Sequence, residues 1–241
     1  YQGVWLNYPE GQKYTSRLSF EKEVMEVLID ALPAVDEFQQ KFASTVTNWL
    51  PFYWKGFTQT TRYTYIIHNL SDLEAVRSDF RENIRREIKK AEKDLVIKTL
   101  AGVDELYSLK QEVYQHNQEV YPIPKELLEK AYAYTKGQGC GEVLAAYDAT
   151  GSLHSILFYV WDQHAAYYLH GGTAHAFKTG GSMSLLLWEA IRRSAKTSQV
   201  FNFEGSMIES IERYFRAFGG EQVPYFEISR TNSRLLKFLK H

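Results

Sequence analysis

One segment decides the fold predicted for this chain: Lys178-Thr179-Gly180-Gly181-Ser182-Met183, which runs directly into Ser184-Leu185-Leu186-Leu187-Trp188-Glu189-Ala190-Ile191. The first part has the composition of a turn, and the second carries apolar residues at helical spacing. Backbone N–H groups at a helix start have no partner within the helix, and the helix dipole adds partial positive charge. The segment is therefore typical either of a plain turn or of a phosphate-binding loop, to which Lys178 adds a charge.

The elements around this segment alternate in a specific order. Upstream we expect a strand near 95–100, helices over 103–118 and 124–136, a glycine-rich turn over 137–141, and strands near 142–148, 153–162 and 165–171. Downstream of the loop 172–181 we expect a helix over 182–197, a strand over 199–204, a helix over 207–218 and a strand over 224–229. This order predicts an α/β (α+β) fold whose mixed, mostly antiparallel sheet carries helices on both faces.

The first 95 residues contain fewer clear signals. Helical spacing predicts a helix over 19–32, started by Ser19 and closed by Pro33, and a β-branched and aromatic run predicts a strand over 58–67. A helix is expected over 72–94, with one apolar stripe and many basic residues on its remaining surface. The basic surface is either a solvated face or a contact for an anionic ligand, for which Arg85 is the candidate residue.

The composition excludes several classes of protein. Lys and Arg (28) nearly cancel Asp and Glu (29), so no net field recruits nucleic acid or an anionic membrane. The single cysteine, Cys140, excludes an intramolecular disulfide and a cysteine-rich zinc site, and the His spacing suggests no metal. No apolar run approaches the roughly 20 residues of a membrane helix. We therefore expect a cytoplasmic protein without metal or membrane span; because Tyr1 is not Met, a lost upstream segment stays open.

Two segments near the C-terminus carry a further pattern: Phe201-Asn202-Phe203-Glu204-Gly205-Ser206 and Ile211-Glu212-Arg213-Tyr214-Phe215-Arg216-Ala217-Phe218-Gly219. They resemble the Fem-like branch of the GNAT superfamily of N-acetyltransferases. The first segment is similar to that branch's aromatic-Asp-aromatic-x-Gly strand end, and the second is similar to its helix closing in Phe-Lys-x-x-Phe-Gly. The basic stretch 81–93 resembles the segment that joins the two halves in that branch. The resemblance covers roughly residues 60–241. It implies a bacterial-type protein with two GNAT-like halves, 1–95 and 96–241, of which the first need not be complete.

This sequence departs from the family's pattern in three respects. Asn202 stands where the branch usually has Asp. Many GNAT enzymes place an acidic Tyr four residues before the Gly that ends the last long helix, and this position is Phe215, with Tyr214 beside it. Because a helix turns about 100° per residue, Tyr214 is expected to point elsewhere unless the register shifts. Finally, no heptad pattern indicates the helical hairpin of the Fem peptidyl transferases, so use of tRNA is disfavoured.

Acyl transfer to an amine needs a group that takes the amine proton. His170 ends a predicted strand just before the glycine-rich loop, and Glu204 ends the next strand, so both are candidate bases. Tyr214 is the candidate acid. Each of the two bases also has a structural interpretation: His170 as a histidine bonded to a neighbouring strand, and Glu204 as a carboxylate at a helix start.

The acceptor is predicted to contact aromatic residues. Tyr53 and Trp54 belong to an aromatic cluster over 49–57 that is hard to bury completely, and Tyr168 lies on the strand before the loop. The structural alternatives are that the aromatic cluster packs the two halves together and that Tyr168 packs within the core.

The leading hypothesis is an acyltransferase that moves an acyl group from acyl-CoA, such as acetyl-CoA, to a small-molecule or peptide amine. Lys178, Thr179, Gly180, Gly181, Ser182 and Met183 would hold the donor's pyrophosphate. Two alternatives stay open: a Fem-type peptidyl transferase that uses aminoacyl-tRNA, and a GNAT-fold binding protein without catalysis. The acceptor, the acyl group and the oligomeric state are not indicated by the sequence.

Overall fold

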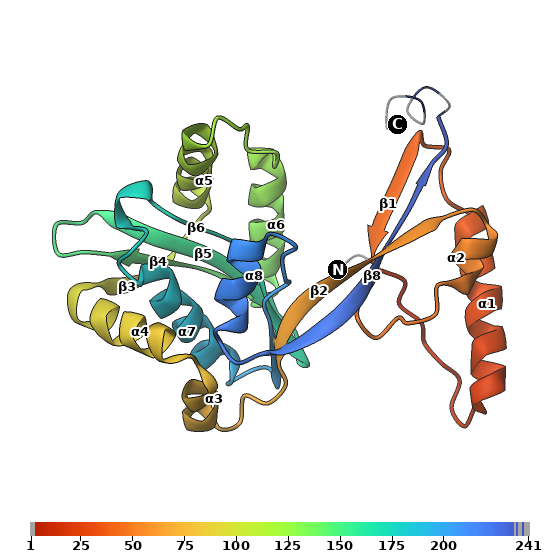
Figure 1. The fold of residues 1–241 in the computed structure, drawn as a ribbon, viewed down its shortest axis with the longest axis horizontal. Helices are drawn as coiled ribbons and strands as arrows, with labels where there is room; N and C mark the ends of the chain where they lie inside the picture. Colours follow the sequence, from red (N-terminus) through yellow and green to blue (C-terminus); the bar gives the residue numbers. More distant parts are fainter. Residues whose placement is uncertain (1–2, 234, 236–237, 239–241) are drawn as a thin grey trace. The chain divides into compact units, whose positions relative to one another are not determined.

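The computed structural model describes residues 3–233, 235 and 238 (Figure 1). The helices are α1 (Tyr14–Asp30), α2 (Leu50–Trp54), α3 (Leu73–Asp79), α4 (Glu82–Asp94), α5 (Asp104–His116), α6 (Lys125–Gly137), the 3₁₀-helix η1 (His175–Phe177), α7 (Ser182–Ser194) and α8 (Glu209–Arg216). The strands are β1 (Glu37–Lys41), β2 (Thr58–Ile67), β3 (Val96–Leu100), β4 (Gly141–Tyr147), β5 (Leu153–Trp161), β6 (Ala165–Thr173), β7 (Val200–Asn202) and β8 (Glu221–Thr231).

The chain divides into two compact units. Unit 1 combines the residues up to Thr64 with those from Val223 onward, and unit 2 comprises Tyr65–Gln222. The boundaries fall inside β2 and β8. The predicted division into 1–95 and 96–241 was between two GNAT-like halves, which need not coincide with the compact units. It stays a prediction.

Unit 1 has a small core of its own. Strand β1 pairs with β8 in antiparallel register, from Glu37 opposite Thr231 to Lys41 opposite Glu227. Helices α1 and α2 contribute buried apolar side chains to a cluster that contains Met25, Ile29, Phe42, Phe52, Phe57 and Ile228. Ring pairs such as Phe52 with Phe57, whose centroids are 5.3 Å apart, add edge-on contacts to this burial.

Unit 2 is built on the strand order β2-β7-β6-β5-β4-β3. Every pair in this order is antiparallel except β6 with β7, which run parallel. Strand β4 shows why both faces are covered: Val143 and Ala145 are buried toward one side, while Leu144 and Ala146 are buried toward the other. A strand that is apolar on both faces needs a layer of helices on each.

Two cores therefore flank the sheet of unit 2. The larger core contains residues of α3, α4, α7 and α8, and the smaller one contains residues of α5 and α6. Figure 1 shows α5 and α6 on one side of the sheet and α3, α4 and α7 on the other. The predicted fold class, a mixed and mostly antiparallel sheet with helices on both faces, is confirmed.

The helix predicted over 72–94 is in fact two helices. Phe80 and Arg81 have extended backbone angles and separate α3 from α4. Phe80 is buried, with its ring centroid 5.4 Å from that of Trp188 and 5.1 Å from that of Phe218. Because the helical spacing continues through this break, periodicity alone does not reveal it; tertiary packing of Phe80 decides the local structure.

Other differences between the predicted and the observed elements lie in unit 1. Helix α1 begins at Tyr14 rather than at Ser19, whose hydroxyl donates to the carbonyl of Thr15 within the helix. Strand β1 and helix α2 were not predicted. Within the described residues, no helix combines the length and apolarity that crossing a membrane requires.

Candidate functional site

Strands β6 and β7 begin side by side and then part. Their parallel ladder covers Ala165 with Val200, Ala166 with Phe201 and Tyr167 with Asn202, whereas β6 continues to Thr173. On the other edge of β6 the register with β5 shifts, because Phe158 pairs with His170 and Tyr159 with Tyr168. This leaves Leu169 as an extra residue, and such a bulge bends a strand and re-aims its side chains.

A cavity of about 550 Å³ lies beside this divergence, a volume suited to a small-molecule ligand. Its walls come from α4, β6, the start of α7 and α8. The lining residues are Glu87, Tyr168, Gly171, Gly172, Thr173, Lys178, Gly181, Ser182, Met183, Ser184, Leu187, Ser210, Ile211, Tyr214 and Phe215. We call it the donor cavity below.

Helix α7 starts at the donor cavity. Gly181 is the cap residue, with φ of 73°, and its carbonyl accepts from the N–H of Leu185. Among the described residues no side chain caps this helix start. The first N–H groups of α7 therefore lie at the wall of the cavity with the positive end of the helix dipole, the arrangement that suits an anion.

The predicted donor loop is only partly in the cavity. Lys178, Gly181, Ser182 and Met183 line it, whereas Thr179 and Gly180 are not among its lining residues. The hydroxyl of Ser182 is buried, 2.6 Å from that of Ser155, which in turn lies 2.8 Å from Thr173 Oγ1. This hydroxyl network fixes the start of α7 to β5 and β6.

Gly181 has a structural reason to be glycine. A Cβ atom there would lie 2.8 Å from the main-chain oxygen of Glu87 and 2.9 Å from its Cβ. Helix α4 therefore makes the close approach that requires glycine at this position. The backbone amides of α7, rather than space above Gly181, are what an anion can use.

Tyr214 lies in the donor cavity, contrary to the expectation from helical rotation. Its hydroxyl is 2.8 Å from Ser184 Oγ, while the ring of Phe215 is buried between Phe203 and Tyr168. The short helix α8 thus presents both residues toward the larger core, Phe215 to its interior and Tyr214 to the cavity. Burial raises the pKa of the Tyr214 phenol, so the hydroxyl keeps its proton at neutral pH.

Ser184 joins Tyr214 to a carboxylate on α4. Ser184 Oγ donates to Glu87 Oε2 at 2.6 Å, and Ser184 itself is buried. Glu87, Ser184 and Tyr214 therefore form one hydrogen-bonded chain, which we call the relay triad.

His170 has different surroundings and is not among the residues that line the donor cavity. Its ring lies edge-on to Tyr121 with centroids 6.2 Å apart, and Lys110 of α5 is nearby, donating to the carbonyl of Gly171 at 3.2 Å. Burial, and to a smaller extent the charge of Lys110, lowers the pKa of His170 to about 4. The imidazole is therefore neutral at pH 7 but a weak base.

Glu204 follows β7 in a left-handed conformation, with φ of 58°. Its N–H donates to Asn202 Oδ1 at 2.8 Å, so the buried Asn202 shapes this turn. Glu204 is likewise not among the lining residues of the donor cavity. The structure thus brings Tyr214 and most of the donor loop together, and places His170 and Glu204 outside that wall.

The predicted acceptor residues lie in several places. Tyr168 lines the donor cavity and has a pKa raised by burial. Arg85 is exposed on α4 and donates to the carbonyl of Ser78 at 3.0 Å. Tyr53 and Trp54 lie on α2 of unit 1, where both are more than half exposed. Their role in binding an acceptor stays a prediction.

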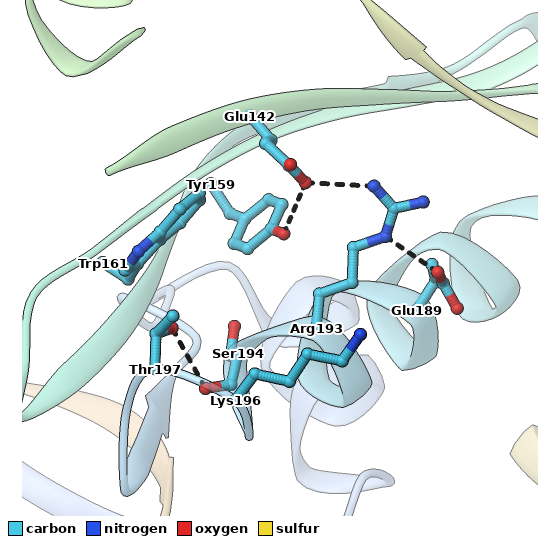
Figure 2. Close-up of a pocket in the computed structure, with 8 residues that line it drawn as sticks. All are labelled: Glu142, Tyr159, Trp161, Glu189, Arg193, Ser194, Lys196 and Thr197. Atoms are coloured by element: carbon cyan, nitrogen blue, oxygen red, sulfur yellow. Dashed lines mark hydrogen bonds and ion pairs between the residues drawn. The ribbon is translucent and has the colours of Figure 1, made fainter. Parts of the chain in front are cut away.

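A second cavity, of about 430 Å³, lies near the other end of α7 (Figure 2). Arg193 donates there to Glu142 Oε2 at 3.1 Å and to Glu189 Oε1 at 2.8 Å, and Tyr159 donates to the same Glu142 oxygen at 2.8 Å. Figure 2 shows Arg193 between the two carboxylates. Because these charges already satisfy one another, we interpret this cavity as a structural ion-pair network.

Among the described residues, no group of three or more His, Cys, Asp and Glu side chains is placed to hold a metal ion. Cys140, the single cysteine, is half-buried in the turn before β4.

Sequence reasoning missed Glu87 and Ser184. Glu87 is one of many charges on α4 and was interpreted as part of a solvated surface. The spacing does indicate that Glu87 faces the core, because it lies three residues after the buried Ile84 and four before the buried Ala91, on the same helical face. Ser184 was hidden because a serine inside an apolar helix has no distinctive pattern.

A family model described as Acetyltransferase (GNAT) domain matches residues 78–207, which is more than half of the chain. The chain therefore belongs to the GNAT acetyltransferase family. No curated protein sequence matches it significantly.

Solved structures share the fold at low sequence identity. FemX superposes with a TM-score of 0.68 at 10% identity, over 99% of this chain and 81% of FemX. The C-terminal domain of a putative lysylphosphatidylglycerol synthetase from Agrobacterium fabrum has a TM-score of 0.60 at 12% identity, over 95% of this chain and 77% of that domain. A GCN5-related N-acetyltransferase from Kribbella flavida has a TM-score of 0.55 at 11% identity, over 91% and 78%. The predicted GNAT-type, Fem-like fold is confirmed.

Proposed function

We propose that this protein transfers an acyl group from an acyl-CoA to an amine. The observation that carries the proposal is the start of α7 at the wall of the donor cavity, next to the point where β6 and β7 part. Family membership supports acyl transfer as the reaction class, and the cavity supports a small-molecule donor.

The donor's pyrophosphate is assigned to the amides of Ser182, Met183 and Ser184, with Lys178 as the nearby cation. Lys178 is exposed, so it contributes mainly long-range attraction. Thr179 and Gly180 shape the loop. The acyl end is assigned to the part of the cavity near Tyr168 and Tyr214.

Acyl transfer places three demands on the protein: a neutral amine, a group that accepts its proton, and a donor to the leaving sulfur. Tyr214 is protonated and lies in the donor cavity, which fits the role of donor. His170 and Glu204 stay candidate bases, and both would act from outside the cavity wall. The acceptor is proposed to be a small molecule or peptide amine.

Calorimetry with acetyl-CoA tests the donor assignment. We expect binding that saturates below millimolar ligand, together with a rise in the melting temperature that follows ligand concentration. Coenzyme A, which keeps the pyrophosphate but lacks the acyl group, should bind as well, whereas pantetheine alone should bind more weakly. Absence of heat and of any thermal shift at millimolar acetyl-CoA would contradict the proposal.

Aminoacyl transfer from tRNA is a second candidate, favoured by the similarity of the whole fold to FemX. Binding of aminoacyl-tRNA with a steep salt dependence, in the absence of acetyl-CoA binding, would replace the first proposal by this one. A binding protein without catalysis is the third. The variants His170→Ala and Glu204→Ala separate it from an enzyme, because a pure binder keeps its affinity and has no turnover to lose.

A further inference from the structure

The relay triad connects the donor cavity to a carboxylate through two hydroxyl groups. Tyr214 Oη lies 2.8 Å from Ser184 Oγ, and Ser184 Oγ lies 2.6 Å from Glu87 Oε2. All three residues line the cavity, and they come from three different helices, α8, α7 and α4. Three elements that meet at two short hydrogen bonds make the arrangement well defined.

The direction of these hydrogen bonds follows from counting protons. An ionised carboxylate only accepts, so Ser184 gives its single proton to Glu87. Ser184 Oγ must then accept from Tyr214, whose own proton is committed to Ser184. While Glu87 is ionised, Tyr214 therefore presents lone pairs to the cavity and receives a proton from a ligand. Once Glu87 is protonated, every bond in the chain reverses and Tyr214 donates into the cavity.

We propose that Glu87 is the proton store of the acyl transfer, and that Ser184 and Tyr214 conduct the proton between Glu87 and the reacting atoms. This inference rests on the proposed function. It assigns the work of both base and acid to one chain of residues, in place of a separate base at His170 or Glu204.

The proton transfers through the relay triad balance. As the bond from the amine nitrogen to the acyl carbon forms, Tyr214 takes a proton from that nitrogen and passes its own to Ser184, which passes its own to Glu87. As the carbon–sulfur bond breaks, the same transfers run backward and Tyr214 delivers the proton to the leaving sulfur. The net change is one C–N bond made, one C–S bond broken and one proton moved from nitrogen to sulfur. No redox partner is needed.

Other ionisable groups at the cavity do not compete for this proton. Lys178 lines the cavity as a cation at neutral pH, and Tyr168 has a pKa raised by burial. On α4 itself, Arg86 directly precedes Glu87 and Lys90 follows it by three residues, and both are exposed. Glu87 is thus the one carboxylate among the residues that line the cavity.

The first experiment measures turnover of acetyl-CoA by release of free thiol, with water or lysinamide as acceptor. We expect Glu87→Gln and Ser184→Ala each to lower kcat about 10²- to 10⁴-fold, the usual contribution of acid–base catalysis, with the KM for acetyl-CoA changed less than about threefold. The control Glu82→Gln, on the exposed face of α4, should keep the parent kcat and KM.

The second experiment needs no donor. In protein labelled with carbon-13 at the tyrosine ζ position, the Tyr214 hydroxyl proton should be observed by NMR and should exchange slowly with water. Its exchange should accelerate at least about tenfold in Ser184→Ala. It should stay slow in Ser210→Ala, which removes another hydroxyl from the cavity wall, one helical turn before Tyr214.

The outcomes separate the two proposals. If acetyl-CoA does not bind, the proposed function fails and the relay fails with it. If acetyl-CoA binds and is turned over, but Glu87→Gln keeps the parent kcat, the relay alone is wrong. Binding without thiol release with either acceptor contradicts both the proposed transfer and the relay. Fast exchange of the Tyr214 hydroxyl in the parent protein contradicts the relay alone.

Discussion

The Cβ position of Gly181 lies 2.8 Å from the main-chain oxygen of Glu87. The start of α7 is therefore pressed against α4 without room for any side chain. This contact holds the amides assigned to the donor beside the carboxylate of the relay triad.

Gly181→Ala should destabilise the protein by about 2–4 kcal/mol. The backbone at this position has φ of 73°, which is strained for alanine, and the added methyl would overlap Glu87. Gly180→Ala is the matched control, because its nearest contact is Phe177 O at 3.3 Å and its φ is not positive. Urea unfolding measures both; equal stability losses in the two variants would contradict the proposed packing.

Lys178→Ala should weaken acetyl-CoA binding about two- to fivefold at low salt and less at high salt. The residue is exposed, so its interaction with the pyrophosphate is screened and is worth at most about 1 kcal/mol. Lys136→Ala removes the same charge from α6, away from the donor cavity, and should leave the Kd unchanged. Calorimetry at two salt concentrations makes the comparison.

Protonation of His170 should make the protein less stable in acid. Its folded pKa is about 4, below its ordinary value of 6.5, so the unfolded chain binds more protons between these values. The stabilising contribution is complete above pH 6.5 and is lost as the pH falls toward 4. We expect a loss of about 3 kcal/mol across this window, which His170→Asn should remove.

NMR titration of His170 checks what lowers the pKa of this residue. The parent protein should show a midpoint near pH 4. Lys110→Met removes the nearby charge and should raise the midpoint only partly, because burial is the larger cause. A midpoint near 6.5 in the parent protein would show that the ring is solvated.

Arg193→Ala should destabilise the protein by about 1–3 kcal/mol and leave the Kd for acetyl-CoA within twofold of the parent value. The substitution removes hydrogen bonds to both Glu142 and Glu189, and Glu142 loses a charged partner. Arg192→Ala, which removes an exposed partner of Glu189 alone, should cost less than about 0.5 kcal/mol. A large change in Kd would show that the second cavity takes part in ligand binding after all.

Most of unit 2 could be predicted from the sequence because its elements are short, periodic and separated by clear turn residues. Strand β5, for example, was expected over 153–162 and is found at Leu153–Trp161. Strand β1 was missed because its sequence Glu-Phe-Gln-Gln-Lys has only one apolar residue, and it becomes a strand through pairing with β8. A partner almost two hundred residues away leaves no local signal.

The candidate site was harder to predict than the fold. The donor loop was found through the glycine pair before an apolar helix, and Tyr214 through the end of α8. The side chains that join them, Ser184 and Glu87, are separated by almost one hundred residues, and single-sequence patterns carry no information on that contact. His170 was expected at the reaction centre from its position at a strand end, but the Leu169 bulge lies between it and Tyr168. Its ring lies edge-on to Tyr121, in the segment between α5 and α6, instead.

The pairing of β1 with β8 has a consequence for biosynthesis. Strand β1 cannot pair until the ribosome has synthesised its partner β8. Unit 1 therefore stays partly folded while the residues between the two strands are translated. Long-range pairing of this kind slows folding. We expect the N-terminal segment to be the last part of the nascent chain to become resistant to proteases.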